Sequence, residues 1–352
     1  MEKLFLDGTK LKYHLKELSL WQKSQLKGPL HVEISLTSGC NQRCILCCVD
    51  HLGHKSVMLS DELLKRLPRE LKMAGVKSVL LAGEGEPLLH KKAALFIDDL
   101  YTEGIDVALN SNAVLLNEDF CEKSLEKLEW ARFTLQAGNL KTYNEIHRPK
   151  ETDFHTACFN IQKAVSLKKD KKLKVTLGIQ QILLPENLAH VYETAKLAKE
   201  LGVDYFVVKR FSKHPKNSYD VPDDFYLNAT SEFEKCQSLK DKKFEPIVRW
   251  NNFTQDCHRN YKKCLGLPFI TQILATGKIY PCSLFFHEED YCYGDLNKES
   301  FQELIKSKQT LSIQEKIKEN QDVHKCMSYC RHHSVNQFLW QFHESPEHLN
   351  FI

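Results

Sequence analysis

The sequence predicts an α/β fold: a partial (β/α)6 TIM-like barrel followed by a smaller, C-terminal cysteine-rich domain. From about residue 30 to 211, short apolar runs alternate with helical patterns, which is typical of a parallel sheet with right-handed crossovers. Six such units are present rather than eight, which favours an open barrel over a closed one. Seven of the 13 cysteines lie between Cys236 and Cys330, where periodic helices are few.

The composition is that of an ordinary globular protein, with 42% hydrophobic and 27% charged residues among 352. A formal net charge of +3 is too small to indicate nucleic acid as a partner. No apolar run is long enough to span a membrane, and the charged N-terminus lacks a signal-peptide core. We therefore expect a cytoplasmic protein without membrane contact. Disulfides are disfavoured in the cytoplasm, so clustered cysteines indicate metal binding or catalysis.

The strands are predicted from their apolar runs, and several helices from capping residues. Ser60, Asn117 and Asn187 each precede a helical pattern and are suited to N-cap positions. The functional face of such a barrel lies where strands end and βα loops begin. The predicted strands are His31–Leu36, Lys77–Ala82, Ile105–Leu109, Trp130–Leu135, Leu173–Ile179 and Asp204–Val208.

Five segments are expected along the chain. The barrel and the cysteine-rich domain are joined by a mixed stretch that is interpreted as a connector. The segments are an N-terminal helical extension (1–29), the barrel (30–211), the connector (212–256), the cysteine-rich domain (257–335) and a C-terminal tail (336–352).

Three cysteines follow the first predicted strand with the spacing C-x₃-C-x₂-C, at Cys40, Cys44 and Cys47. Iron–sulfur clusters are normally held by four cysteines, so three on one loop suggest a cubane with one iron open to a substrate or cofactor. The alternative is a zinc site with Cys48 or His51 as the fourth ligand.

This motif and its place after the first strand resemble the radical S-adenosylmethionine (SAM) superfamily, over about residues 30–210. The resemblance implies a [4Fe–4S] cluster on Cys40, Cys44 and Cys47 that binds SAM. It also implies reductive cleavage of SAM to a 5′-deoxyadenosyl radical, which abstracts a substrate hydrogen. Flavodoxin or ferredoxin is the electron donor that it implies. One departure is Leu46, where the family usually has an aromatic residue.

The resemblance also assigns residues near SAM. Gly83-Glu-Gly-Glu-Pro87 resembles the family's GGEP-type segment, so Gly85 and Glu86 are expected beside the SAM ammonium group. Arg148 is a candidate partner for the SAM carboxylate, because a guanidinium binds a carboxylate bidentately. The other candidates for contact with SAM are Asn112, Gln136 and Leu183, the last against adenine.

The second group of cysteines resembles the SPASM and twitch auxiliary-cluster domains. The resemblance begins at Cys264, runs through Gly277 and continues to Gly294-Asp-Leu296. The one-cluster twitch form fits better than a two-cluster SPASM domain, because no cysteine follows Cys330. A second [4Fe–4S] cluster is therefore expected on Cys264, Cys282, Cys326 and Cys330. Possible substitutes are Cys257, Cys292, His332 and His333, and a zinc knuckle is the alternative site.

A fully ligated second cluster favours electron transfer, and dehydrogenases of the twitch type have this architecture. The leading hypothesis is oxidation of an alcohol on a sugar or aminocyclitol-like small molecule, with the auxiliary cluster as electron acceptor. Lys209 and Arg210, after the sixth strand, are the candidates for the base.

Three alternatives remain. Radical epimerisation would need a hydrogen-donating thiol such as Cys48, Cys257 or Cys292. Modification of a ribosomal peptide is common among SPASM relatives, but the roughly 30 residues before the barrel are too few for a typical leader-binding domain. A zinc-binding interaction protein is the non-enzymatic alternative.

Overall fold

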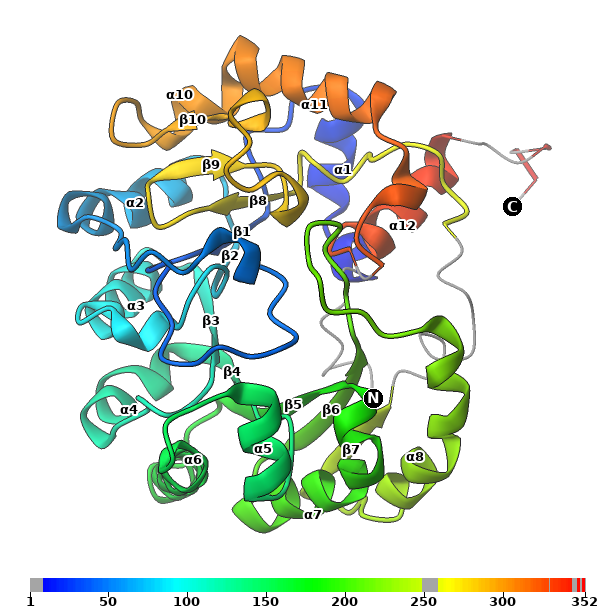
Figure 1. The fold of residues 1–352 in the computed structure, drawn as a ribbon. Helices are drawn as coiled ribbons and strands as arrows, with labels where there is room; N and C mark the ends of the chain where they lie inside the picture. The colour runs from blue at the N-terminus through cyan, green and yellow to red at the C-terminus, as the bar shows by residue number, and fades with distance from the viewer. Residues whose placement is uncertain (1–8, 249–258, 329, 344–346, 349, 352) are drawn as a thin grey trace.

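The computed structural model describes residues 9–248, 259–328, 330–343, 347–348 and 350–351. In these residues one sheet runs in the order β10-β9-β8-β1-β2-β3-β4-β5-β6-β7 (Figure 1). Neighbours from β8 to β7 are parallel, whereas β9 is antiparallel to both β8 and β10. The strands are β1 (His31–Ile34), β2 (Ser78–Leu81), β3 (Asp106–Ser111), β4 (Leu128–Thr134), β5 (Thr176–Leu183), β6 (Tyr205–Arg210), β7 (Glu245–Val248), β8 (Ile270–Ile273), β9 (Lys278–Tyr280) and β10 (Gly294–Asp295).

Helices connect most of the parallel strands and cover the outer face of the sheet (Figure 1). No described helix is long and apolar enough to cross a membrane. The α-helices are α1 (Leu15–Gln22), α2 (Asp61–Met73), α3 (Ala93–Thr102), α4 (Glu118–Ser124), α5 (Leu140–His147), α6 (Asp153–Asp170), α7 (Val191–Leu201), α8 (Thr230–Gln237), α10 (Phe301–Lys306), α11 (Lys308–Asn320) and α12 (His333–His343). The 3₁₀ helices are η2 (Thr9–Tyr13), η3 (Asp50–Leu52), η4 (Pro87–Leu89), η5 (Leu125–Lys127), η6 (Pro185–His190), η7 (Asp223–Ala229), η8 (Ser283–Phe285), η9 (Glu289–Tyr291) and η10 (Val323–Lys325).

The predicted partial barrel is confirmed, and all six predicted strands are present as β1–β6 with ends that differ by a few residues. The sheet is larger than predicted at both sides. β7 extends it beyond β6, from residues that we expected to be a connector. Its short sequence contains Pro246, which a strand tolerates at a sheet edge because no ladder hydrogen bond is lost there. β8, from the cysteine-rich domain, pairs directly with β1.

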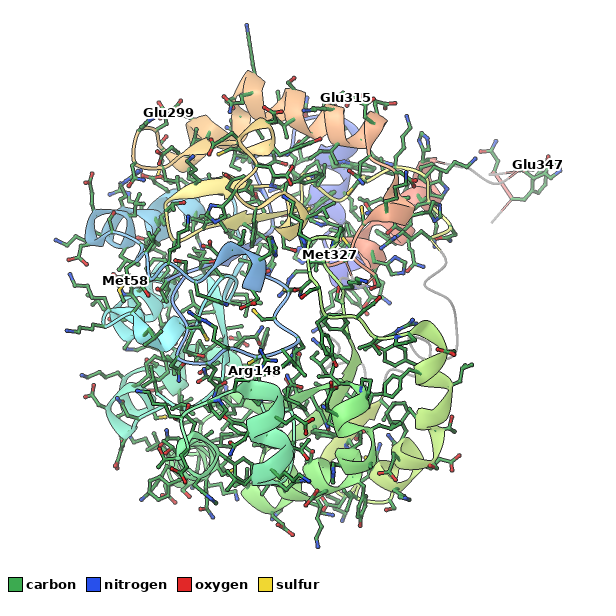
Figure 2. The ribbon with its side chains drawn as sticks, in the orientation of Figure 1. Met58, Arg148, Glu299, Glu315, Met327 and Glu347 are labelled. Atoms are coloured by element: carbon green, nitrogen blue, oxygen red, sulfur yellow. The ribbon has the colours of Figure 1, made fainter. Side chains whose placement is uncertain are left out.

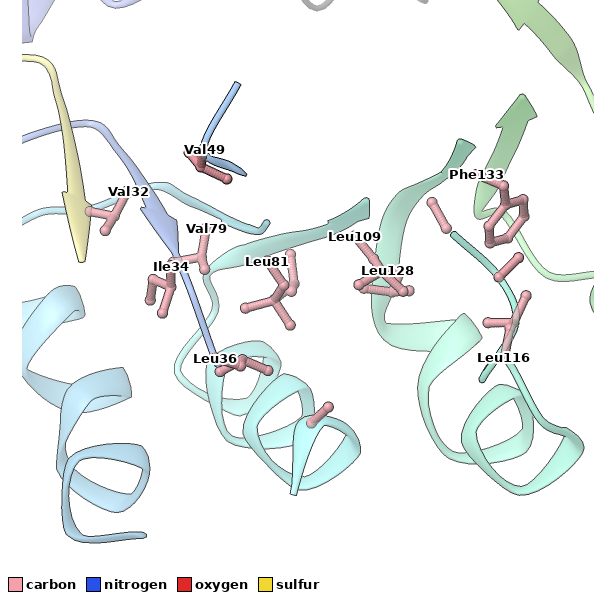
Figure 3. Packing of buried hydrophobic residues seen from close by; sticks show 14 of the residues in the cluster. Val32, Ile34, Leu36, Val49, Val79, Leu81, Leu109, Leu116, Leu128 and Phe133 are labelled. Atoms are coloured by element: carbon pink, nitrogen blue, oxygen red, sulfur yellow. The ribbon is translucent and has the colours of Figure 1, made fainter. Parts of the chain in front are cut away.

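The two faces of the parallel sheet differ in character. One face packs against the helices through alternating apolar side chains, among them Val32, Ile34 and Leu81 (Figure 3). The opposite face, which we call the lumen face, has a small apolar cluster of its own. Alternation along each strand assigns to the lumen face Glu33, Leu80, Ala108, Asn110, Trp130, Arg132, Gln180, Tyr205, Lys209 and Gln272.

A second, smaller core joins the two ends of the chain to the start of β8. Leu11 and Leu18 from the N-terminal segment pack in it with Phe269, Leu339 and Trp340. α12 begins at His333 and therefore continues from the cysteine-rich domain into the predicted tail. The segments before the barrel and after the last cysteine thus stabilise the same region of the molecule.

Candidate active site

The loop that carries the first three cysteines has a fixed base at the end of β1. Thr37 forms an isolated antiparallel bridge with Met58. Its hydroxyl donates to the Val57 carbonyl at 2.9 Å and accepts from the Gly39 N–H at 3.0 Å. These contacts bring the start and end of the loop together at the edge of the sheet where the βα loops meet, which is where barrel enzymes place their active sites.

Cys40, Cys44 and Cys47 lie in this loop as one group of half-buried thiols. Burial raises the pKa of each thiol, to about 12 for Cys44. After burial, the neighbouring thiol of Cys40 raises the pKa of Cys44, and Cys48, Cys44 and Cys40 do the same for Cys47. The three sulfurs therefore lie within electrostatic range of one another, and soft sulfur donors of this kind fit an iron–sulfur cluster.

Two other elements hold the cysteine loop in place. The end of α5 accepts two backbone hydrogen bonds from it, from Arg43 N–H to the His147 carbonyl at 3.1 Å and from Ile45 N–H to the Ile146 carbonyl at 2.9 Å. From the loop after β6, the Asn217 side chain donates to the Cys47 carbonyl at 2.8 Å. The position of the sulfurs is thus set by backbone contacts on both sides of the loop.

Gly85 brings the loop after β2 against the cysteine loop. A Cβ at this position would lie 2.0 Å from the Gly39 carbonyl oxygen and 2.7 Å from that of Thr37, so only glycine fits. The next residue, Glu86, donates its backbone N–H to the same Gly39 carbonyl at 2.9 Å. The predicted proximity of this segment to the cluster loop is therefore a backbone contact.

The Glu86 carboxylate is directed toward the neighbouring loop after β3. It accepts hydrogen bonds from the Ser111 hydroxyl at 2.7 Å, the Asn112 N–H at 2.8 Å and the Leu88 N–H at 3.2 Å. Burial raises its pKa, although these three hydrogen bonds oppose that shift. In this arrangement Glu86 fixes the β2 and β3 loops relative to each other, and contact with the SAM ammonium group stays a prediction.

Asn112 and Gln136 are also engaged with the protein. The Asn112 amide donates to the Asn41 side chain at 2.7 Å, inside the cysteine loop. The Gln136 side-chain oxygen accepts a hydrogen bond from Ile182 N–H at 2.6 Å. The backbone N–H of Gln136 donates to the Nε2 atom of His147 at 3.1 Å. Both residues therefore hold the loops in place, and their contact with SAM stays a prediction.

Arg148 and Leu183 lie in contrasting environments. Arg148 is exposed and follows α5 with φ +46°, a left-handed conformation, beside the cysteine loop (Figure 2). This position leaves its guanidinium accessible to a carboxylate. Leu183 is fully buried in the helix-facing core, whereas Ile182 is half-buried on the lumen side. The expected adenine contact at Leu183 thus has no exposed surface in this structure.

Lys209 and Arg210 point to opposite faces of β6. Lys209 pairs in register with Ile182 on the lumen face and is half-buried. Arg210 lies on the helix-facing side, 8% exposed, with its guanidinium 4.2 Å from the centre of the Tyr226 ring. Of the two candidate bases, the structure directs only Lys209 toward the lumen.

The four auxiliary cysteines come from separate segments and converge to within electrostatic range of one another. Cys264 precedes β8, Cys282 follows β9, and Cys326 and Cys330 flank the turn between η10 and α12. Burial raises the pKa of all four, and the neighbouring thiols raise it further for Cys264, Cys282 and Cys326. Asn336 also donates to the Cys264 sulfur at 3.5 Å. This convergence fits the predicted four-thiolate set for a second cluster.

The possible substitute ligands are placed differently. The Cys292 thiol contacts the Gly294 carbonyl at 3.4 Å, and burial raises its pKa, with no contribution from the four cysteines. Cys257 lies outside the described residues. The His332 ring contacts the Ile270 carbonyl at 3.4 Å and also the Cys330 sulfur at 3.9 Å, whereas the His333 ring contacts the Tyr261 hydroxyl at 3.1 Å. Among the described residues, no three His, Cys, Asp or Glu side chains are grouped as ligands of a single metal ion.

Two carboxylates that were not among the predicted site residues connect the barrel to the second domain. Glu33 in β1 forms a bidentate ion pair with Arg331, with both N–O distances at 2.7 Å. Arg331 directly follows the candidate ligand Cys330. Glu84 accepts from Ala275 N–H at 3.0 Å and contacts a His287 ring nitrogen at 2.9 Å. A charged residue inside the apolar β1 pattern was the sequence signal for Glu33.

The chain belongs to the radical SAM superfamily. The family model for this superfamily matches residues 34–209, half of the chain. A second model, the SPASM iron–sulfur cluster-binding domain, matches residues 264–332. The protein is therefore a radical SAM enzyme with a [4Fe–4S] cluster, SAM as cofactor and auxiliary iron–sulfur in its second domain. This membership argues against the zinc-binding interaction protein.

Solved structures share the fold at low sequence identity. SuiB from Streptococcus suis bound to the precursor peptide SuiA has a TM-score of 0.64 at 17% identity, covering 86% of this chain and 71% of that one. Native anSMEcpe with AdoMet and the Kp18Cys peptide has a TM-score of 0.61 at 14% identity, covering 89% and 97%. A comparison with curated proteins gave no match.

Proposed function

We propose that this radical SAM enzyme oxidises an alcohol carbon of a small, polar, sugar-like metabolite and passes one electron to its auxiliary cluster. The single observation that supports this most is the convergence of Cys264, Cys282, Cys326 and Cys330. Four thiolates saturate a cubane, so such a cluster has no open iron for substrate and is suited to electron transfer.

When bound, the first cluster supplies the electron that cleaves SAM to methionine and a 5′-deoxyadenosyl radical. In the proposed oxidation the substrate C–H would give a hydrogen atom to that radical, and the substrate O–H would give a proton to a base. The remaining electron would pass to the auxiliary cluster and return to the first cluster, so that no net reductant is consumed. The product is a carbonyl, and the atoms and electrons balance. In this proposal the proton is accepted by Lys209, which the strand register places on the lumen face.

Polar groups on the lumen face support a hydroxylated and negatively charged substrate. Arg132 is 5% exposed, donates to the Tyr205 hydroxyl at 3.0 Å and lies 4.8 Å from the centre of the Trp130 ring. No described carboxylate forms an ion pair with it. The side-chain oxygens of Asn110 and Gln272 are buried without a hydrogen-bond partner in the described residues. Because buried polar groups are normally satisfied, these two acceptor oxygens suit donating substrate hydroxyl groups. The Arg132 guanidinium, which only donates, suits a substrate carboxylate or phosphate.

The Glu33–Arg331 ion pair supports the proposed electron path. Glu33 lies in the strand that leads into the first cysteine loop, and Arg331 is bonded to Cys330. The charges of both residues act on the half-buried Cys48 thiol: after burial, Glu33 raises its pKa and Arg331 lowers it. The Glu33–Arg331 ion pair therefore joins the strand before the first cysteine loop to the residue that follows Cys330.

The test measures where the abstracted hydrogen and the electron go. Anaerobically reconstituted enzyme is incubated with SAM, limiting dithionite and deuterated sugar or aminocyclitol candidates. Oxidation predicts deuterium in 5′-deoxyadenosine, a carbonyl product, and more turnovers than electrons added as dithionite. Lys209→Gln should slow product formation while SAM cleavage continues, and Arg132→Gln should raise the substrate KM. A product that keeps its oxidation level would overturn the proposal.

Radical epimerisation remains the first alternative, and Cys48 is its best-placed hydrogen donor. The reaction run in D₂O separates the two outcomes, since epimerisation places one solvent deuterium on the product carbon and oxidation places none. Cys48→Ala should abolish an epimerase and leave an alcohol oxidase active.

A peptide is the second candidate substrate. SuiB and anSMEcpe were solved with peptides bound, and the fold that they share spans 86% and 89% of this chain. Small-molecule and peptide substrates are separated by offering deuterated serine- or cysteine-containing peptides beside deuterated sugars. Label that enters 5′-deoxyadenosine only from peptides would identify a peptide-modifying enzyme.

A further inference from the structure

His147 lies against a sulfur of the first cysteine group. Its ring is fully buried at the end of α5, and Nδ1 is 3.3 Å from the Cys44 sulfur. This proximity is fixed by the backbone, because Arg43 N–H donates to the His147 carbonyl on one side of Cys44 and Ile45 N–H donates to Ile146 on the other. The contact therefore does not depend on how the thiol itself is oriented.

Hydrogen bonds around the ring determine where its proton lies. The Gln136 backbone N–H, which can only donate, points at Nε2 at 3.1 Å. Nε2 must therefore carry the lone pair, and the imidazole is neutral with its proton on Nδ1. The Nδ1–H therefore faces two acceptors and is shared between them, the Gln42 side-chain oxygen at 2.8 Å and the Cys44 sulfur at 3.3 Å. The Tyr143 ring stacks on the imidazole at 4.2 Å.

A second histidine near the loop has the opposite arrangement. His54 Nε2 is 3.7 Å from the Cys47 sulfur, while its Nδ1 faces the Ser38 carbonyl at 3.2 Å. A carbonyl can only accept, so the neutral ring of His54 keeps its proton on Nδ1, away from Cys47. Of the two histidines, only His147 presents an N–H to a candidate cluster ligand in its neutral form.

We infer that His147 donates an Nδ1–H hydrogen bond to the Cys44 thiolate and thereby raises the reduction potential of the SAM-binding cluster. An iron-bound thiolate has no proton and carries negative charge, so it accepts this hydrogen bond more strongly than a thiol does. Hydrogen bonds to ligand sulfurs are among the factors that set cluster potentials, because they stabilise the reduced, more negative state. His147 is thus a positioning residue that acts through Cys44.

The inference concerns the cluster and does not rest on the proposed substrate or reaction. Its test therefore uses holoenzyme without substrate, titrated electrochemically and followed by EPR. The signal that changes on SAM addition identifies the first cluster and separates it from auxiliary iron–sulfur. His147→Leu should shift the potential of that cluster to a more negative value. His147→Asn should restore most of the shift, because its side-chain N–H lies at the position of Nδ1.

Two features make these variants informative. Leu and Asn both remove the acceptor of the Gln136 N–H, so a purely structural effect would be equal in the two. His90→Leu is the matched control, since in the described part of the chain the ring of this buried histidine hydrogen-bonds the Leu59 carbonyl and the Lys92 N–H and no cysteine. This variant should leave the potential unchanged. Equal potentials in wild type and His147→Leu, both with intact clusters, would overturn the inference.

A second measurement keeps the test decisive if His147→Leu fails to assemble its cluster. Holoenzyme of the His54→Leu variant is labelled with ¹⁵N-histidine and reduced, and pulsed EPR measures nitrogen coupling to the SAM-responsive cluster. A hydrogen bond from His147 predicts a resolved ¹⁵N coupling and an exchangeable proton coupling. Absence of both couplings would contradict the inference regardless of the other variants.

Discussion

The two cysteine groups of this protein are built in different ways. Cys40, Cys44 and Cys47 occupy one loop of the barrel, whose base is closed beside β1. The auxiliary cysteines come from separate segments, next to β8, β9 and α12. The first site is therefore largely local, whereas the second depends on long-range folding.

This difference suggests different roles for metal in the two domains. The large core packs the barrel sheet against its helices and also includes residues of the second domain, such as Tyr280, Phe301 and Ile317. The core around α1, α12 and the start of β8 is much smaller. Small domains with limited cores often gain stability from metal binding, because the binding free energy becomes folding free energy. We expect the auxiliary cluster to be structural as well as redox-active, and the first cluster to be mainly catalytic.

The largest expected effect is loss of SAM cleavage from the first group. Replacement of Cys40, Cys44 or Cys47 by Ala should reduce 5′-deoxyadenosine formation to background, because the open iron is lost. Chromatography of the nucleoside products after dithionite reduction measures this. Cys121→Ala, a buried cysteine in α4, is the control and should retain the activity. Persistent cleavage in the triple variant would contradict the ligand assignment.

Loss of the auxiliary ligands should separate the two functions. Cys282→Ala and Cys330→Ala should lower the iron content and abolish substrate oxidation, while SAM is still cleaved by the first cluster. Iron and sulfide analysis, together with nucleoside chromatography, tests this separation. Cys292→Ala is the matched control in the same domain and should retain full iron. Equal iron loss in that control would show that the ligand set needs revision.

Removal of iron should unfold the two domains to different extents. In apoprotein, residues 259–285 and 323–340 should lose protection against hydrogen exchange, whereas β2–β5 should remain protected. Hydrogen–deuterium exchange followed by mass spectrometry compares the two regions in one sample. Equal loss in both regions would show that the second domain is stabilised by its packing rather than by its cluster.

Gly85→Ala should disturb the first site through sterics alone. The added methyl group meets the Gly39 carbonyl at 2.0 Å, and overpacking of this kind costs about 1–3 kcal/mol. We expect a lower thermal midpoint and weaker SAM binding. Gly53→Ala, in the cysteine loop, is the control, because its Cβ meets nothing within 4 Å and only its φ of +80° opposes the change. A larger effect at Gly53 would contradict the close-approach explanation.

The smallest expected effect concerns the ion pair between the two domains. Glu33 is buried, but the Arg331 side chain is 45% exposed, so solvent weakens the pair and its loss should cost about 1 kcal/mol. Glu33→Gln, Arg331→Gln and the double variant form a cycle that thermal unfolding of the holoprotein measures. A coupling near zero would show that this ion pair does not contribute to holding the two domains together.

Much of the barrel could be predicted because its signals are local. Alternating apolar runs defined β1–β6, and Ser60 and Asn117 cap α2 and α4 as expected through hydrogen bonds to Leu63 N–H and Phe120 N–H. β7 was missed because four residues containing a proline give a weak pattern. The pairing of β8 with β1 was also missed, since neighbours in a sheet can be far apart in sequence.

The candidate site shows the same limit at the level of single residues. The spacing of the first cysteines and the glycine at Gly85 could be read directly, because each depends on backbone within one segment. The Glu86 hydrogen bonds to Ser111 and Asn112 could not, because they depend on which loop lies beside it. Strand alternation implied that Lys209 and Arg210 point in opposite directions. It did not predict which residues surround each side chain, such as the Tyr226 ring beside Arg210.

The sequence by itself determined the superfamily, the strand–helix order and the three-cysteine loop, because each depends on short-range patterns of residue type and spacing. Only the tertiary structure decided that β8 extends the barrel sheet and that Cys264, Cys282, Cys326 and Cys330 converge. It alone placed His147 beside Cys44. Such contacts between distant segments form where they bury apolar surface and satisfy buried polar groups, and no local pattern specifies that pairing.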